Sequence, residues 1–324
     1  RALAQAKEEP KDMLEQCRFE QFLFYDQWHQ VRSYANERGI LLFGDMPIFV
    51  AHDSAEVWAR RDLFDLNDDG QPNTVAGVPP DYFSETGQRW GNPQYNWERM
   101  QADGFIWWKE RLGSQLELFD FIRVDHFRGF EAYWSIAADE ETAINGHWIK
   151  APGDELFDAL RERYGALPLV AEDLGIITPE VDALREKYGL PGMKILQFAF
   201  EGGPDNPYLC HNHQKNTVVY TGTHDNNTTV GWYNECSPEL IEHIKDYMGH
   251  PQEEIPWPLI RACMASVAKL AIVPLQDVLG LDESHRMNTP GTTEDNWRWR
   301  FKWEWINEEV REKMRHIIQL YGRN

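Results

Sequence analysis

Apolar side chains recur along this chain with two different periods. Helical spacing or a helix-start signal predicts helices over residues 13–36, 102–118, 154–163 and 256–270, and after Thr178 and Ser237. Between them lie short apolar runs with the length of buried strands, at residues 40–45, 119–125, 167–171, 193–200, 217–220 and 271–277. Strands that alternate with helices predict parallel βα units, and therefore an α/β fold.

Polar residues follow the C-terminal end of one predicted strand after another. This pattern favours a (β/α)₈ barrel, a TIM barrel, over a doubly wound sheet, and no glycine-rich phosphate loop follows any strand. The six predicted strands are two fewer than a closed barrel needs, and the helix at 13–36 that precedes the first of them has no strand before it. The chain also begins with Arg1 in a stretch of helical character. We therefore expect residues 1–324 to form one catalytic barrel that lacks its first two βα units.

Residues 53–100 break the regular alternation with Pro, Gly, Asn and Asp between aromatic residues. A segment of this length is too long for a simple connection, so we predict an inserted loop-rich subdomain. Within it, residues 65–70 match the first half of a calcium loop, but Ala76 stands where the bidentate Glu should be. We interpret this stretch as an acidic turn and predict no metal site there.

The overall charge restricts the possible partners. The chain has 32 basic and 53 acidic residues and a net charge of −21, which disfavours nucleic acids and anionic membranes as partners. Neutral ligands remain possible. The chain has 14 Trp, 12 Tyr and 16 Phe, with Trp above ordinary usage, and exposed aromatic faces of this kind can pack on sugar rings. The four cysteines form no CxxC pair, and we find no signal peptide and no apolar run long enough to span a bilayer. We therefore expect a cytoplasmic location.

Three strand ends carry candidate catalytic carboxylates: Asp125, Glu172 and Asp225. Alternation puts Arg123 and Asp125 on one side of their strand, where the guanidinium should lower the pKa of Asp125 and keep it ionised, as a covalent sugar nucleophile requires. Glu172 follows an apolar run, which should raise its pKa toward that of a working acid. Asp173 is the competing choice, but Glu172 has the longer reach.

Other interpretations of these residues stay open at this stage. Arg123 and Asp125 could form a purely structural ion pair. His126 and His224 each flank a candidate carboxylate, so they could bind zinc with them, although nothing defines a ligand spacing. Neutral histidines that donate to sugar hydroxyls fit the pattern better.

Several segments resemble the conserved blocks of amylomaltases, the 4-α-glucanotransferases of glycoside hydrolase family 77. The likeness runs through the chain in order, at residues 44–51, 77–93, 123–129, 171–175, 221–226 and 286–288. The resemblance implies that Asp125 is the nucleophile, Glu172 the acid/base and Asp225 the transition-state stabiliser. It also implies that Arg123, His126 and His224 line the subsite of the cleaved sugar, with further glucan contacts at Asp45, Asp81, Tyr82, Gln88, Trp90 and Asn288.

This family resemblance predicts transfer of α-1,4-glucan segments between maltooligosaccharides, without a metal or other cofactor. We expect the aromatic loop at residues 81–83 to act as a mobile lid that keeps water out. Cys210 departs from the family pattern, because proline is expected there. An α-glucan hydrolase of the α-amylase clan and a non-catalytic glucan-binding fragment are the two alternative functions.

Overall fold

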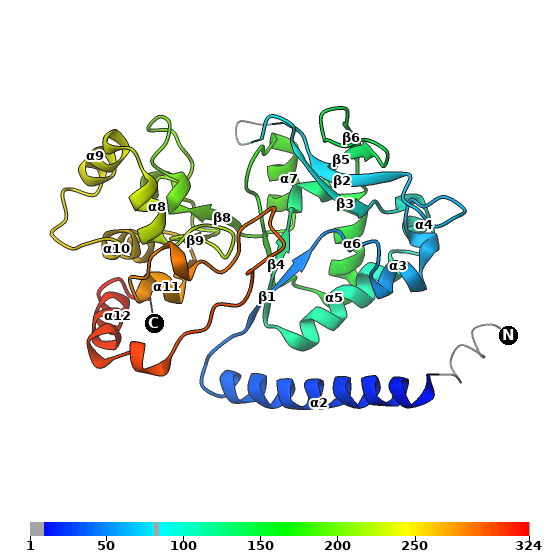
Figure 1. Ribbon diagram of the computed structural model, residues 1–324, viewed down its shortest axis with the longest axis horizontal. Helices are drawn as coiled ribbons and strands as arrows, with labels where there is room; N and C mark the ends of the chain where they lie inside the picture. Colours follow the sequence, from blue (N-terminus) through cyan, green and yellow to red (C-terminus); the bar gives the residue numbers. More distant parts are fainter. Residues whose placement is uncertain (1–9, 81–83, 324) are drawn as a thin grey trace. The chain divides into compact units, whose positions relative to one another are not determined.

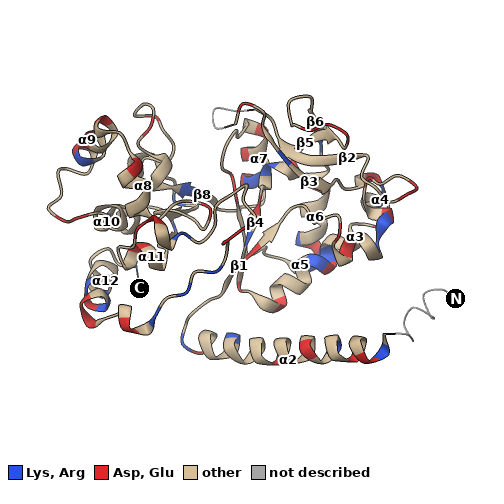
Figure 2. Cartoon of the chain, viewed as in Figure 1, with Lys and Arg blue, Asp and Glu red and all other residues tan. Residues whose placement is uncertain are grey.

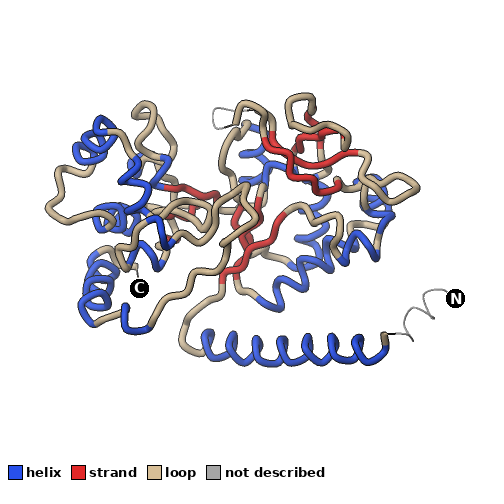
Figure 3. Tube along the Cα trace, viewed as in Figure 1, coloured by secondary structure: helices blue, strands red, loops and turns tan. Residues whose placement is uncertain are grey.

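The computed structural model describes residues 10–80 and 84–323. The chain divides into two compact units, Arg1–Leu190 and Pro191–Asn324 (Figure 1). Each unit contains a three-stranded parallel sheet with helices between its strands (Figure 3). All six predicted strands are present, and the prediction of an α/β fold from parallel βα units is confirmed.

The parallel sheet of the first unit has the order β1-β4-β7, with strands β1 (Phe43–Pro47), β4 (Phe121–Asp125) and β7 (Leu169–Ala171). The connecting helices are α5 (Ile106–Leu118), which precedes β4, and α6 (Gly153–Tyr164), which precedes β7, while α7 (Pro179–Lys187) follows β7. One face of this sheet packs against these helices in the main core, through Met46, Ile122, Val124, Leu169 and Ala171. Because side chains alternate along a strand, Asp45, Arg123 and Asp125 lie on the opposite face.

The segment predicted as a loop-rich insertion is more regular than expected. It contains the helices α3 (Ala55–Ala59) and α4 (Trp97–Ala102) and the strands β2 (Thr74–Val78) and β3 (Gln88–Pro93). With β5 (Ala132–Ala137) and β6 (His147–Lys150), these strands form an antiparallel sheet in the order β3-β2-β5-β6. The β2–β3 register is irregular, and a Cβ at Gly77 would lie 2.2 Å from the carbonyl oxygen of Gln88, so only glycine fits there.

Helix α2 (Lys11–Asn36) is largely exposed for a helix with so many apolar residues. Only Ala35 is buried along its 26 residues. The indole of Trp28 donates to the carbonyl of Leu118 at 2.9 Å, and Arg32 pairs with Asp120 at 2.7 Å, which ties one side of the helix to the end of α5. Its exposed apolar side chains include Met13, Phe19, Phe22, Phe24, Val31 and Tyr34.

The second unit has the sheet order β10-β9-β8, with strands β8 (Gly192–Ile195), β9 (Thr217–Tyr220) and β10 (Leu270–Ile272). Its helices are α8 (Thr229–Glu235), α9 (Pro238–Tyr247), α10 (Trp257–Ala265), α11 (Leu275–Val278) and α12 (Glu308–Leu320). Two predicted strands end earlier than expected. Residues 196–198 form a 3₁₀ turn, and Pro274 caps α11 instead of continuing the strand. The predicted helix at 256–270 also ends early, at Ala265.

None of the helices within residues 10–80 and 84–323 combines the length and the apolar character needed to cross a membrane.

Candidate active site

A buried guanidinium joins two carboxylates, Asp45 in the middle of β1 and Asp125 at the end of β4, and Figure 2 shows acidic residues in both strands. The strand register places Asp45 opposite Arg123. Nη1 of Arg123 donates to both carboxylate oxygens of Asp45 at 2.9 and 2.8 Å, and its Nη2 lies 2.7 Å from Oδ1 of Asp125. The Arg123 side chain is only 10% exposed, whereas the carboxylates of Asp45 and Asp125 are 42% and 41% exposed.

The charge state of this cluster follows from its geometry. Burial disfavours the charged form of Arg123, but the carboxylates of Asp125, Asp45 and Glu172 outweigh burial and raise the pKa of the guanidinium. Because Arg123 keeps its proton, its ion pair stabilises the carboxylate form of Asp125. Asp125 therefore presents an ionised and oriented oxygen toward solvent.

Glu172 follows β7 directly and is half-buried beside Asp125. Its Oε2 accepts a hydrogen bond from the backbone N–H of His126 at 2.7 Å, and its Oε1 accepts one from the N–H of Leu174 at 2.9 Å. Burial, and secondly the charge of Asp125, raise the pKa of Glu172 to about 7, while Arg123 and the two N–H donors oppose this rise. Glu172 can therefore hold and release a proton near neutral pH.

Asp173, the competing choice, occupies a different environment. It is 6% exposed, and its Oδ2 lies 3.4 Å from Nε of Arg185, a buried residue of α7. Arg185 also contacts Asp182 at 3.0 Å. The Asp173 carboxylate thus belongs to an ion-pair network with α7.

His126 has a left-handed backbone conformation, with φ of 51°, which turns its N–H toward Glu172. Its ring packs edge-on against Trp90 with 4.8 Å between the ring centroids, and Trp90 Nε1 donates to Gln88 Oε1 at 3.1 Å. Burial, and then the charge of Arg128, lower the pKa of His126 to about 4, so the ring is neutral at pH 7. In the described part of the chain its buried Nε2 has no hydrogen-bond partner.

Asp225 lies in the second unit, in the loop between β9 and α8. Its Oδ1 accepts a hydrogen bond from Nδ2 of Asn288 at 2.6 Å, its Oδ2 lies 3.2 Å from Nε2 of His224, and its carbonyl oxygen accepts one from Nη2 of Arg286 at 2.6 Å. The ring of Trp297, 55% exposed, lies 5.0 Å from that of His224. The Asp225 carboxylate is thereby held by neighbours and stays 42% exposed.

The structure thus brings the predicted residues together in two groups, one in each unit. Asp45, Gln88, Trp90, Arg123, Asp125, His126 and Glu172 gather in the first unit, and His224, Asp225 and Asn288 gather in the second. Asp81 and Tyr82, with the predicted lid, lie outside the described residues. Sequence reasoning did not assign roles to Arg286 and Trp297. Arg286 could have been noticed, because it lies with Asn288 in residues 286–288, a segment that resembles a conserved block of the family.

No three His, Cys, Asp or Glu side chains within residues 10–80 and 84–323 are grouped so that they could hold a metal ion.

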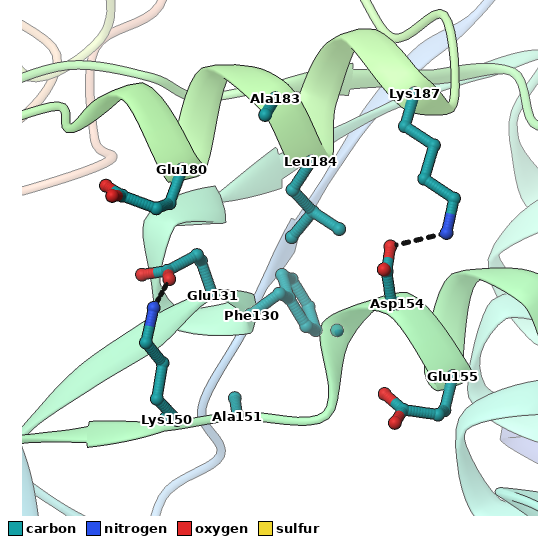
Figure 4. A pocket seen from close by; sticks show the side chains of 11 residues that line it. Phe130, Glu131, Lys150, Ala151, Asp154, Glu155, Glu180, Ala183, Leu184 and Lys187 are labelled. Atoms are coloured by element: carbon teal, nitrogen blue, oxygen red, sulfur yellow. Dashed lines mark hydrogen bonds and ion pairs between the residues drawn. The ribbon is translucent and has the colours of Figure 1, made fainter.

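A separate cavity of about 440 Å³ lies between α6 and α7 in the first unit (Figure 4). Two ion pairs lie in its lining, Lys150 with Glu131 and Lys187 with Asp154. None of the predicted site residues lines it. We therefore place the candidate active site at the strand ends and not in this cavity.

Carboxyl groups at the C-terminal ends of parallel strands, beside exposed aromatic rings, are typical of carbohydrate-active proteins. The chain belongs to glycoside hydrolase family 77, whose family model, described as 4-alpha-glucanotransferase, matches residues 1–306. It is 52% identical over 308 residues to the 4-alpha-glucanotransferase of Thermus thermophilus, an alignment that covers 93% of this chain and 62% of that protein. It is 46% identical over 327 residues to the chloroplastic/amyloplastic 4-alpha-glucanotransferase of Solanum tuberosum, covering 99% and 57% of the two chains.

Two solved amylomaltase structures share the fold of this chain. The amylomaltase from Streptococcus agalactiae in complex with acarbose superimposes with a TM-score of 0.96 at 40% identity, over 99% of this chain and 65% of that chain. The amylomaltase from Corynebacterium glutamicum, at 21% identity over 91% of this chain and 48% of that chain, gives a TM-score of 0.74. The chain spans about three fifths of the length of the curated relatives it matches.

Proposed function

We propose that this chain carries the catalytic residues of a 4-α-glucanotransferase, which transfers α-1,4-glucan segments between maltooligosaccharides with retention of configuration. The observation that carries the proposal is the pairing of two carboxyl groups from adjacent strands in different states. Asp125 is held as a carboxylate by Arg123, whereas the pKa of the half-buried Glu172 is raised to about 7. A retaining mechanism needs one carboxylate nucleophile and one proton donor.

In the first step, Asp125 attacks the anomeric carbon of the donor glucan. The bond from this carbon to the glycosidic oxygen breaks, and Glu172 gives its proton to that oxygen as the leaving chain departs. The product is a glycosyl ester of Asp125. In the second step, the ionised Glu172 takes the proton of an acceptor 4-hydroxyl, whose oxygen attacks the anomeric carbon and releases Asp125. One α-1,4-glycosidic bond has then been broken and another has been formed.

The other predicted residues would bind the glucan around this reaction. We propose that Asp225 stabilises the transition state and that Arg123, His126 and His224 line the subsite of the cleaved sugar. The exposed ring of Trp90 and the unpartnered ring nitrogen of His126 support this assignment. Further glucan contacts would come from Asp45, Gln88, Trp90 and Asn288, together with Asp81 and Tyr82. The likeness to an amylomaltase in complex with acarbose supports a maltooligosaccharide as the ligand.

We further propose that residues 1–324 belong to one TIM barrel, with residues 53–100 as an inserted subdomain. In such a barrel all strand ends open at one mouth. Two further βα units would complete the barrel. This is supported by the position of β1 at the edge of its described sheet and by the uncovered apolar side chains of α2.

Cysteines without a pairing pattern support a cytoplasmic location.

The proposed activity predicts disproportionation of maltotriose by the intact protein. We expect glucose and longer maltooligosaccharides to appear with no net gain in reducing ends, because each broken glycosidic bond is replaced by another. Chromatography of the products, with a reducing-end assay, measures both quantities. A net rise in reducing ends would instead identify a hydrolase, and glucan binding without any product would identify a binding protein.

The assignment of Glu172 over Asp173 predicts separable effects. Asp173→Asn should lower the free energy of unfolding by about 1–3 kcal/mol, because it removes a buried partner of Arg185. The same variant should keep its transfer rate within about threefold of wild type, since Asp173 contacts α7. Urea unfolding and the maltotriose assay measure the two effects. An unchanged stability with a loss of turnover would reverse the assignment.

A further inference from the structure

The loop that carries His224 and Asp225 runs from the end of β9 to the start of α8. Its two ends are threonines, since Thr221 follows the last residue of β9 and Thr229 is the first residue of α8. Both threonines have 0% exposure. The conformation of residues 222–228 therefore depends on how these two buried ends are fixed.

One buried carboxylate contacts both ends of this loop. Asp277, in α11 just after β10, is 1% exposed. Its Oδ2 accepts hydrogen bonds from the hydroxyls of Thr221 at 2.6 Å and Thr229 at 2.7 Å, and its Oδ1 accepts one from the backbone N–H of Thr229 at 2.7 Å. Three donors from two segments thus converge on a single side chain.

Placing a carboxylate at this buried position costs free energy, so packing alone does not explain why an aspartate is there. Burial raises the pKa of Asp277 against the effect of its three donors, which means that the charged form is penalised there. A well-packed apolar side chain would avoid this penalty and is often as stabilising as a buried charge. What an apolar residue would lack is the ability to orient two hydroxyls and one N–H at once.

The middle of the same loop has its own contacts. Asn288 and Arg286 hold the side chain and the carbonyl of Asp225. The side chain of Gln197 donates to the carbonyl of Asn227 at 2.9 Å. Each of these contacts holds a single residue of the loop, whereas Asp277 contacts both Thr221 and Thr229.

We propose that Asp277 is a positioning residue, which fixes both ends of the 222–228 loop so that Asp225 meets the transition state in a single orientation. This inference rests on the proposed function, in which Asp225 stabilises that state. A group that acts mainly on the transition state affects kcat more than KM when it is displaced. A misplacement of about 1 Å can cost on the order of 100-fold in rate.

The test compares one substitution of Asp277 with two of Thr221, in the intact protein, with maltotriose as substrate. Asp277→Asn and Thr221→Val should each lower kcat by about 10- to 100-fold and change KM by less than about threefold. Thr221→Ser keeps the hydroxyl and should restore kcat to within about threefold of wild type. The double variant Asp277→Asn/Thr221→Val should be no slower than Asp277→Asn alone, because both changes break one contact.

Thr217→Val is the matched control, because Thr217 is a buried threonine at the other end of β9 with 3% exposure. We expect it to lower the melting temperature about as much as Thr221→Val and to leave kcat unchanged. A wild-type kcat in Asp277→Asn or in Thr221→Val would overturn the proposal, as would an equal loss in Thr217→Val. If Asp225→Asn keeps full activity, the proposed role of Asp225 fails as well. If Asp225→Asn is inactive while Asp277→Asn is fully active, only the positioning role fails.

Discussion

Replacement of Asp125 by Asn should lower the rate of glucan transfer by on the order of 10⁴-fold or more, because an amide cannot form the glycosyl ester. Asn has the same shape as Asp, and Arg123 keeps its two hydrogen bonds to Asp45, so the strand ends should stay in place. Binding of maltotriose should therefore change by less than about tenfold. Initial rates of glucose release and isothermal calorimetry measure the two quantities.

Asp139→Asn provides the control for this variant, because Asp139 is an exposed aspartate between β5 and β6 and lies outside the proposed site. We expect it to match wild type in both measurements. Turnover that survived in Asp125→Asn would remove Asp125 from the role of nucleophile. Loss of binding together with turnover would show that the change had disturbed the strand ends, and not the chemistry alone.

Glu172→Gln should lower kcat by about 10²- to 10⁴-fold, which is the usual contribution of a general acid and base. The wild-type protein should lose kcat/KM as pH rises through about 7, because the raised pKa keeps Glu172 protonated below that pH and ionisation removes the proton that the leaving oxygen needs. The variant should lack this descending limb. A pH series of kcat/KM with maltotriose measures both effects.

An activated donor separates the two carboxyl groups further. Fluoride leaves without a proton, so a maltosyl fluoride donor should restore formation of the glycosyl ester in Glu172→Gln but not in Asp125→Asn. Glu141→Gln, at an exposed glutamate of the β5–β6 connection, should behave as wild type with either donor. If the fluoride failed to speed up Glu172→Gln, or if the variant kept the descending limb near pH 7, Glu172 would not be the acid.

The parallel strands could be predicted because each lies in a short apolar run, such as residues 217–220, which are all buried in β9. The antiparallel sheet gave no comparable signal. Three of the four residues of β6, and the first three of β3, are exposed, so neither strand shows a regular alternation of apolar and polar side chains. The early end of the strand at 271–277 follows from Pro274, which begins a helix there.

The candidate site was predictable in its residue types but not in its connections. Strand alternation was enough to place Arg123 beside Asp125, whereas the preference for Glu172 over Asp173 rested on the longer reach of the glutamate. The left-handed backbone of His126, which gives Glu172 one of its two N–H donors, has little local sequence signal, because histidine adopts that conformation far less often than glycine does. The contacts from Arg286 to Asp225 and from Asp277 to Thr221 join residues 61 and 56 positions apart, beyond the reach of any local pattern.

The register of β4 limits how this protein can vary. Arg123 and Asp125 lie on one face of the strand, while Ile122 and Val124 pack among the helices on the other. Insertion or deletion of one residue just before Ile122 would exchange the two faces of the strand. The guanidinium and the carboxylate would then be buried in the apolar core, and the isoleucine would lie on the face of the candidate site. Mutagenesis libraries of this strand should therefore exchange its buried apolar residues only for others of similar volume and keep its length constant.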